Sequence, residues 1–187
     1  MTTSPGNDRR LRIATSVFDL IESEVRPFLR SGGHLWSRGS AGYPSRLRQM
    51  LGGLDVGYRV TFATSDAMRL PINERVVEHV IPIKRIVIEI VDPDQADPRS
   101  NNHRGPIADG PATSPEHLLR ILDTLTQKCW VTKDEHDRLN RAGASFQWDA
   151  PEGDRWARYR KAGVAPLPLV GEATTPFETD GEPDKLT

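Results

Sequence analysis

The sequence predicts a mixed α+β domain that is mostly helical and carries disordered ends. Several segments repeat apolar residues at steps of three and four positions, which is typical of amphipathic helices. Residues 56–64 and 74–80 are rich in β-branched residues, which favours strands. Residues 1–8 and 165–187 are polar and contain Pro and Gly, so they bury too little apolar surface to offset the entropy cost of ordering. We therefore expect the ordered domain to span residues 9–164.

Length and composition agree with one domain between polar ends. The chain has 187 residues, of which only 36% are apolar, and its mean hydropathy is −0.53. A formal net charge of −1 gives no global attraction to nucleic acid. Arginines nevertheless crowd the first fifty residues, where they form either a solvated helix face or a local contact surface. They are Arg9, Arg10, Arg12, Arg26, Arg30, Arg38, Arg46 and Arg48.

Cysteine content and hydropathy exclude several classes of protein. Cys129 is the single cysteine, which excludes a disulfide within the chain and a zinc site built from several cysteines. No apolar run approaches the roughly 20 residues that span a bilayer. The first residues lack the apolar core of a signal peptide. We expect a cytoplasmic protein with no membrane contact.

The Arg-rich first part, residues 9–55, is expected to be helical. Apolar spacing predicts a helix over residues 8–29, capped by Asp8 and ended or kinked by Pro27. A second short helix is predicted over residues 45–51 and is closed by the glycines that follow it.

The middle of the chain combines clear and ambiguous elements. Residues 83–91 are β-branched like a strand but follow a proline like a helix, and we favour a helix. Residues 92–111 form a long polar loop. Ser114 followed by a proline predicts the start of the next helix, and residues 128–131 are expected to be extended.

Two further helices are predicted near the end of the domain. Thr132 and Glu135 have the spacing of a capping box, which predicts a helix up to about residue 142. A last short helix over residues 154–162 carries Trp156 and Tyr159. We expect these two residues and Trp148 to pack on the domain as a C-terminal aromatic cluster.

The most informative string is Glu78-His79-Val80-Ile81-Pro82. An acid, a histidine, two aliphatics and a proline resemble the first half of the HNH nuclease motif. Adjacent residues of a strand point to opposite sides, so the acid can hold a divalent metal while the histidine faces the attacking water. An imidazole can accept a proton near neutral pH.

The second half of the HNH motif has a counterpart around His136. The family places an asparagine about nine residues before a helical histidine, and here Gln127 stands nine residues before His136. The resemblance implies His79 as the general base, Glu78 and His136 as metal ligands, and Gln127 as the residue that orients the base. Asn101 or Asn102 in the polar loop is the alternative for the asparagine role.

The resemblance covers residues 74–142 and implies a ββα-metal-like core within the helical domain. It departs from the family in two ways, since Gln127 replaces the asparagine and 57 residues separate His79 from His136. The long separation makes the polar loop and the Ser114 helix an insertion. The implied regions are an HNH-like part over residues 56–142 and a C-terminal helix within residues 143–164.

The implied activity is hydrolysis of phosphodiester bonds in DNA by a metal-dependent endonuclease. Mg²⁺ or Mn²⁺ suits a carboxylate and an imidazole, and Zn²⁺ or Ni²⁺ would also bind. The alternative is a non-catalytic accessory or regulatory module that binds nucleic acid or protein, with both histidines on the surface. The candidate DNA contacts are Arg38, Arg46, Arg48, Lys84, Arg85 and Lys133.

Overall fold

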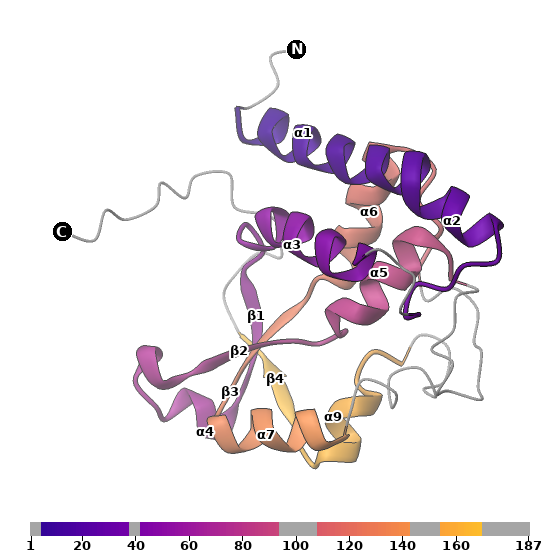
Figure 1. Ribbon diagram of the computed structural model, residues 1–187. Helices are drawn as coiled ribbons and strands as arrows, with labels where there is room; N and C mark the ends of the chain where they lie inside the picture. The colour runs from indigo at the N-terminus through magenta and orange to yellow at the C-terminus, as the bar shows by residue number, and fades with distance from the viewer. Residues whose placement is uncertain (1–4, 38–41, 94–107, 143–153, 170–187) are drawn as a thin grey trace.

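A computed structural model describes residues 5–37, 42–93, 108–142 and 154–169, and it has a mixed α+β fold (Figure 1). The helices are α1 (Pro5–Leu20), the π-helix η1 (Ile21–Val25), α2 (Arg26–Arg30), α3 (Tyr43–Asp55), α4 (Ser65–Met68), the 3₁₀ helix η2 (Ile72–Glu74), α5 (Ile83–Val91), α6 (Pro115–Leu125), α7 (Lys133–Ala142) and α9 (Ala157–Ala162). The strands are β1 (Val60–Thr64), β2 (Val76–His79), β3 (Lys128–Val131) and β4 (Pro166–Pro168). Within these described ranges, no helix is long and apolar enough to cross a membrane.

The strands form one sheet in the order β2-β3-β1-β4. Strand β3 runs antiparallel to β2 and parallel to β1, and β4 pairs antiparallel with β1. In the β2–β3 register, Glu78 lies opposite Cys129 and His79 lies opposite Lys128. Because side chains alternate along a strand, Glu78 and His79 point to opposite faces of the sheet.

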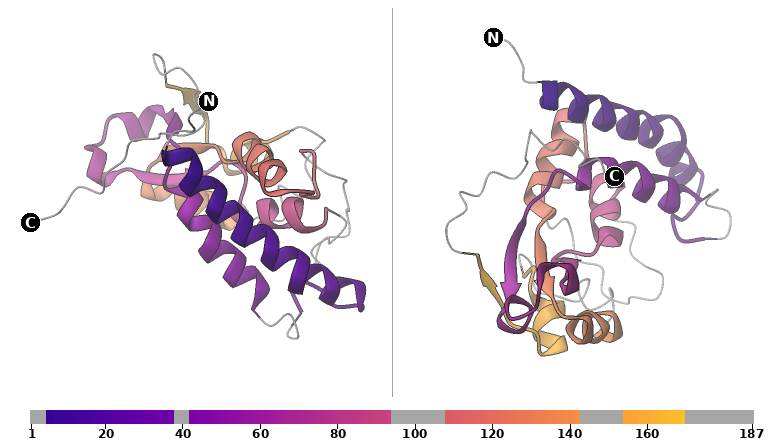
Figure 2. Two further views of the ribbon diagram at one scale, coloured as in Figure 1. Left: turned by 90° about the horizontal axis from the view of Figure 1, so that it is seen from above. Right: turned by 90° about the vertical axis from the view of Figure 1, so that its left-hand side faces the viewer.

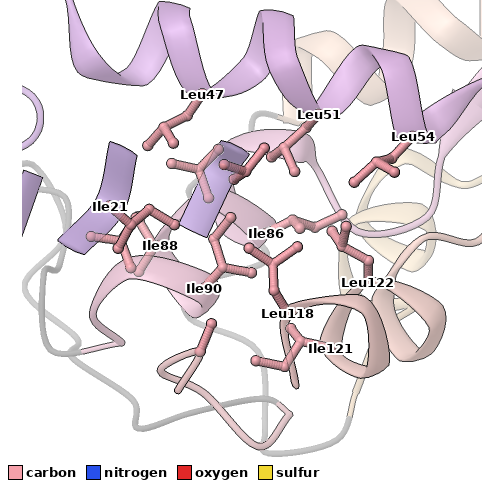
Figure 3. Packing of buried hydrophobic residues seen from close by; sticks show 14 of the residues in the cluster. Ile21, Leu47, Leu51, Leu54, Ile86, Ile88, Ile90, Leu118, Ile121 and Leu122 are labelled. Atoms are coloured by element: carbon pink, nitrogen blue, oxygen red, sulfur yellow. The ribbon is translucent and has the colours of Figure 1, made fainter. Parts of the chain in front are cut away.

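The helices form two groups at opposite ends of the sheet (Figures 1 and 2). Helices α1, α3, α5 and α6 pack together at one end, whereas α7 and α9 lie at the other end. The helical group buries a large aliphatic core, which Figure 3 shows in detail. Its members include Ile21, Leu47, Leu51, Leu54, Ile86, Ile88, Ile90, Leu118, Ile121 and Leu122.

A second, smaller core joins the sheet to α7 and α9. Its buried residues are Val80, Cys129, Val131, Leu139, Tyr159 and Val164. The predicted contact between Trp156 and Tyr159 forms here, because Trp156 packs edge-on against both Phe62 and Tyr159, with ring centroids 4.8 and 5.2 Å apart. Trp148 lies outside the described residues. Helix α9 begins at Ala157, three residues later than expected.

The N-terminal helix is longer than predicted and passes through Pro27. It begins at Pro5, inside the segment expected to be disordered, and continues to Arg30. The turn before the proline is a π-helix, in which the Arg26 N–H bonds to Ile21 O. Proline has no backbone N–H to donate to the helix. A wider turn of this kind accommodates that missing hydrogen bond without ending the helix.

Helix α3 also runs further than predicted. The expected end at the Gly52-Gly53 pair is wrong, because the helix continues to Asp55. Leu51 and Leu54 are 2% and 1% exposed, so burial of this helix face overrides the low helix propensity of glycine. The extension carries Asp55 to the end of α3 that approaches the sheet.

Several local expectations are confirmed. Residues Ile83–Val91 form a helix, directly after Pro82. The Ser114 hydroxyl accepts a hydrogen bond from His117 N–H and caps α6.

The expected disordered tail from residue 165 is wrong at its start, since Pro166–Pro168 form β4 against β1. Asn101 and Asn102 lie outside the described residues.

Candidate functional site

The structure brings Glu78 and His136 together on one side of β2. Oε2 of Glu78 lies 2.7 Å from Nδ1 of His136. Strand β2 carries the glutamate, and helix α7 carries the histidine in its first turn. The proximity expected from the sequence is therefore present.

The capping box that precedes His136 fixes the start of α7. The Thr132 hydroxyl accepts from Glu135 N–H at 3.2 Å, and Glu135 Oε2 accepts from Thr132 N–H at 2.8 Å. Glu135 also accepts a hydrogen bond from the Thr64 hydroxyl on β1 at 2.7 Å. This reciprocal cap sets the rotation of the first helical turn, so His136 faces β2.

Arg158 on α9 occupies the other oxygen of Glu78. Its Nη2 donates to Glu78 Oε1 at 2.6 Å and to the backbone carbonyl of His79 at 2.7 Å. The side chains of Arg158 and Glu78 are 5% and 12% exposed. Arg158 was not predicted from the sequence, because a single arginine in the last helix carries no motif that links it to β2.

Asn140 contacts the second ring nitrogen of His136. It lies one helical turn after His136 on α7, and its Nδ2 is 2.9 Å from Nε2. The imidazole of His136 is therefore held at both nitrogens, which restricts its rotation.

His79 belongs to a separate polar cluster on the α3 side of β2. Its Nε2 lies 2.8 Å from Asp55 Oδ1. The ammonium of Lys128 lies 3.1 Å from Asp55 Oδ2 and donates to the Asp55 carbonyl at 2.7 Å. Burial raises the pKa of Asp55, but the hydrogen bond and charge of His79 and the charge of Lys128 outweigh burial and hold that pKa below its usual value.

Gln127 does not hold the ring of His79 in this arrangement. Its backbone carbonyl accepts from Val80 N–H at 2.9 Å. Its side-chain Oε1 is buried and has no hydrogen-bond partner within the described part of the chain. Asp55, which no sequence motif indicates, is the residue that contacts the ring.

The candidate DNA contacts differ widely in accessibility. The prediction that Arg85 contacts DNA is wrong, because its side chain is 3% exposed and lies near Glu89 inside the helical core. Arg46 and Arg48 are exposed on α3, where Arg46 pairs with Glu24 and Arg48 bonds to the Pro44 carbonyl. Lys84 lies 4.5 Å from the ring centre of Trp36, and Lys133 is exposed and pairs with Asp137. Arg38 lies outside the described residues.

The donor atoms of Glu78 and His136 fit a divalent cation only in part. Glu78 Oε2 and His136 Nδ1 offer one oxygen and one nitrogen, and no group of three His, Cys, Asp or Glu residues suited to a metal occurs among the residues described. Mg²⁺ commonly keeps several waters and takes only one or two carboxylates together with substrate phosphate. The pair therefore fits a site completed by water and substrate, and does not fit an all-protein cage.

No protein-family model, curated protein or solved structure matches this chain. The site residues form a carboxylate–imidazole pair on the α7 side of β2 and an ammonium–carboxylate–imidazole chain on the α3 side.

Proposed function

We propose that this chain is a metal-dependent endonuclease that hydrolyses phosphodiester bonds of DNA at an HNH-like site. The observation that carries the proposal is the 2.7 Å approach of Glu78 Oε2 to His136 Nδ1. Two ligand atoms on one cation lie about 3 Å apart when bonds of about 2.1 Å meet at right angles. The order of β2, β3 and α7 supports a ββα-metal-like core, with α5 and α6 inserted between the two strands.

The chain's residues would divide the chemistry in the following way. Glu78 and His136 would hold the cation, which when bound supplies Lewis-acid stabilisation of the charge that develops on the phosphate. His79 lies on the opposite face of the edge strand β2 from this pair, so it would have to reach the same phosphate around the edge of the sheet. There it would accept a proton from water while the water oxygen bonds to phosphorus. The bond from phosphorus to the 3′ oxygen breaks, and the leaving oxygen takes a proton from solvent.

Exposed basic residues support a nucleic-acid substrate. Arg46 and Arg48 lie on α3, the helix that ends at Asp55 beside His79, and Lys133 opens α7 three residues before His136. Each can contact a phosphate of a bound strand. Because the net charge is −1, DNA attraction would depend on these local positions.

A second candidate function follows from Arg158. Its guanidinium already satisfies Glu78 Oε1 and reaches the carbonyl of His79. This contact favours an ion-pair network that fastens α7 and α9 to β2 in a non-catalytic binding module. In that case the histidines serve the fold rather than a reaction.

The deciding experiment is plasmid nicking by the full chain with Mg²⁺, Mn²⁺, Ni²⁺ or EDTA, together with calorimetric titration of Mn²⁺. Wild type should nick DNA with metal only. His136→Ala should lose both metal binding and nicking, whereas His79→Ala should lose nicking and keep metal binding. His34→Gln is the matched control, because His34 lies outside the site and contacts the Trp36 N–H. Absence of both nicking and metal binding in folded wild type would favour the binding module.

A further inference from the structure

We propose that Asp55 is a positioning residue, which fixes the tautomer of His79 and leaves Nδ1 as the nitrogen that accepts the proton. The proposal rests on the assignment of His79 as the base of the proposed nuclease. It adds a residue from helix α3, which lies before both halves of the HNH-like motif.

The contact between the two side chains defines the tautomer. An ionised carboxylate can only accept hydrogen bonds, so at 2.8 Å from Asp55 Oδ1 the Nε2 atom of His79 must carry the proton. The lone pair of a neutral ring then lies on Nδ1. In the part of the chain that the structure describes, Nδ1 has no hydrogen-bond partner and is not buried. The His79 side chain is 24% exposed, so water can reach that nitrogen.

Lys128 holds the carboxylate of Asp55 from the other side. His79 and Lys128 face each other across the β2–β3 pair, so both side chains lie on the same face of the sheet. Oδ1 of Asp55 contacts His79, and Oδ2 lies 3.1 Å from Lys128 Nζ. With each oxygen engaged, the carboxylate cannot turn away from the imidazole without losing an ion pair.

The backbone of α3 adds rigidity to this arrangement. Lys128 Nζ donates to the carbonyl of Asp55 at the C-terminus of α3, where a cation is favoured by the helix dipole. Leu54, the preceding residue, is 1% exposed in the helical core. The residue that orients His79 is thus anchored by the core and not by a loop, as a precise site requires.

The chemical consequence concerns which nitrogen faces water. In the opposite tautomer, Nδ1 would carry a proton and could not remove one from an attacking water. An acid that holds an imidazole in the reactive tautomer is a recognised device in general base catalysis. Asp55 acts through His79 and does not itself touch the substrate.

The direct test is the tautomer of His79, read by long-range ¹H–¹⁵N correlation on the ¹⁵N-labelled full chain at a pH where the ring is neutral. We expect the Nε2–H form in wild type and a shift toward a mixture of tautomers in Asp55→Ala. Asp55→Asn should favour the Nδ1–H form, because Lys128 can only donate and takes the single amide oxygen, which leaves the amide NH2 to donate to Nε2. An Nδ1–H ring in wild type, or an unchanged tautomer in Asp55→Ala, would overturn the proposal.

Nicking kinetics provide the second readout. Asp55→Ala should lower kcat by roughly 10- to 100-fold, within the range of general base catalysis, and leave KM within about twofold. Asp55→Asn should lose at least as much kcat although it keeps the shape of the side chain, which a merely structural role would not predict. Asp66→Ala is the control, because Asp66 is an exposed carboxylate paired with Arg69. Unchanged kcat in Asp55→Ala would also overturn the proposal.

The two readouts separate failure of this inference from failure of the proposed function. If wild type nicks no DNA with any metal, the nuclease assignment fails, and the tautomer still decides whether Asp55 positions His79. If wild type nicks DNA and the tautomer of His79 is the same with and without Asp55, the nuclease assignment stands and the role of Asp55 fails.

Discussion

Glu78 Oε2 lies 2.7 Å from His136 Nδ1, although 58 positions separate the two residues in the chain. Two further side chains surround the pair, since Arg158 holds the other oxygen of Glu78 and Asn140 contacts the other nitrogen of His136. The pair is therefore built into the junction of β2, α7 and α9. The effect of the Arg158 charge on metal binding by this pair is the first property to test.

Replacing Arg158 by Gln should strengthen metal binding and weaken the fold. The guanidinium lies 2.6 Å from Glu78 Oε1 and opposes a cation at the same carboxylate. Its removal should tighten Mn²⁺ binding by about tenfold in calorimetry, while loss of a buried ion pair should lower the free energy of unfolding by about 2–4 kcal/mol. Arg69→Gln, at an exposed pair with Asp66, should change neither quantity. Weaker Mn²⁺ binding in a folded Arg158→Gln would contradict a metal site at Glu78.

The cap of α7 should contribute strongly to stability. Glu135 is 5% exposed and accepts from both the Thr132 N–H and the Thr64 hydroxyl. Glu135→Ala should cost about 2–3 kcal/mol in urea unfolding, because it leaves buried donors unsatisfied. Thr132→Ala removes only one capping bond and should cost about 1 kcal/mol. Equal losses in the two variants would show that the contact with Thr64 adds nothing.

Local chemistry made part of this fold predictable. Ser114 and Thr132 each carry a short-range cap, which depends on neighbours within three residues. The proximity of Glu78 and His136 was also expected, because the motif pattern spans both positions. Their roles as ligands stay a prediction.

Long-range packing explains what the sequence did not predict. Helix α3 continues through two glycines because Leu51 and Leu54 are buried, and only that extension brings Asp55 to His79. Arg85 looked like a surface cation, but α5 is buried on nearly all sides and the guanidinium lies near Glu89 one turn on. Neither outcome can be read from a window of neighbouring residues.

Cys129 should be unreactive in the folded protein. The side chain is 0% exposed, and burial raises the pKa of its thiol to about 12. Because only the thiolate attacks disulfide reagents, labelling in native buffer should occur only as fast as the protein opens. Labelling should become complete in denaturant. Rapid reaction of the native protein would contradict the burial of β3 beneath α7 and α9.

The buried phenol of Tyr58 should make the fold sensitive to alkali. Burial raises the pKa of Tyr58, and the hydrogen bond that its hydroxyl donates to Asp123 at 2.7 Å raises it further, against the opposing effect of Arg10. A raised pKa means that the folded state keeps its proton where the unfolded chain loses it. This stabilisation is complete below the ordinary value of 10.0 and is lost as the pH rises above it.

The measurement is urea unfolding at a series of pH values between about pH 8 and pH 11. Above the ordinary tyrosine pKa, each such phenol should lower the free energy of unfolding by up to about 1.4 kcal/mol per pH unit. Tyr58→Phe should remove one such contribution and flatten the alkaline limb, at a loss of about 1 kcal/mol near neutral pH from the missing hydrogen bond. Tyr159→Phe provides the comparison, because burial also raises the pKa of that phenol. An alkaline limb as steep in Tyr58→Phe as in wild type would contradict a protonated Tyr58 between Arg10 on α1 and Asp123 on α6.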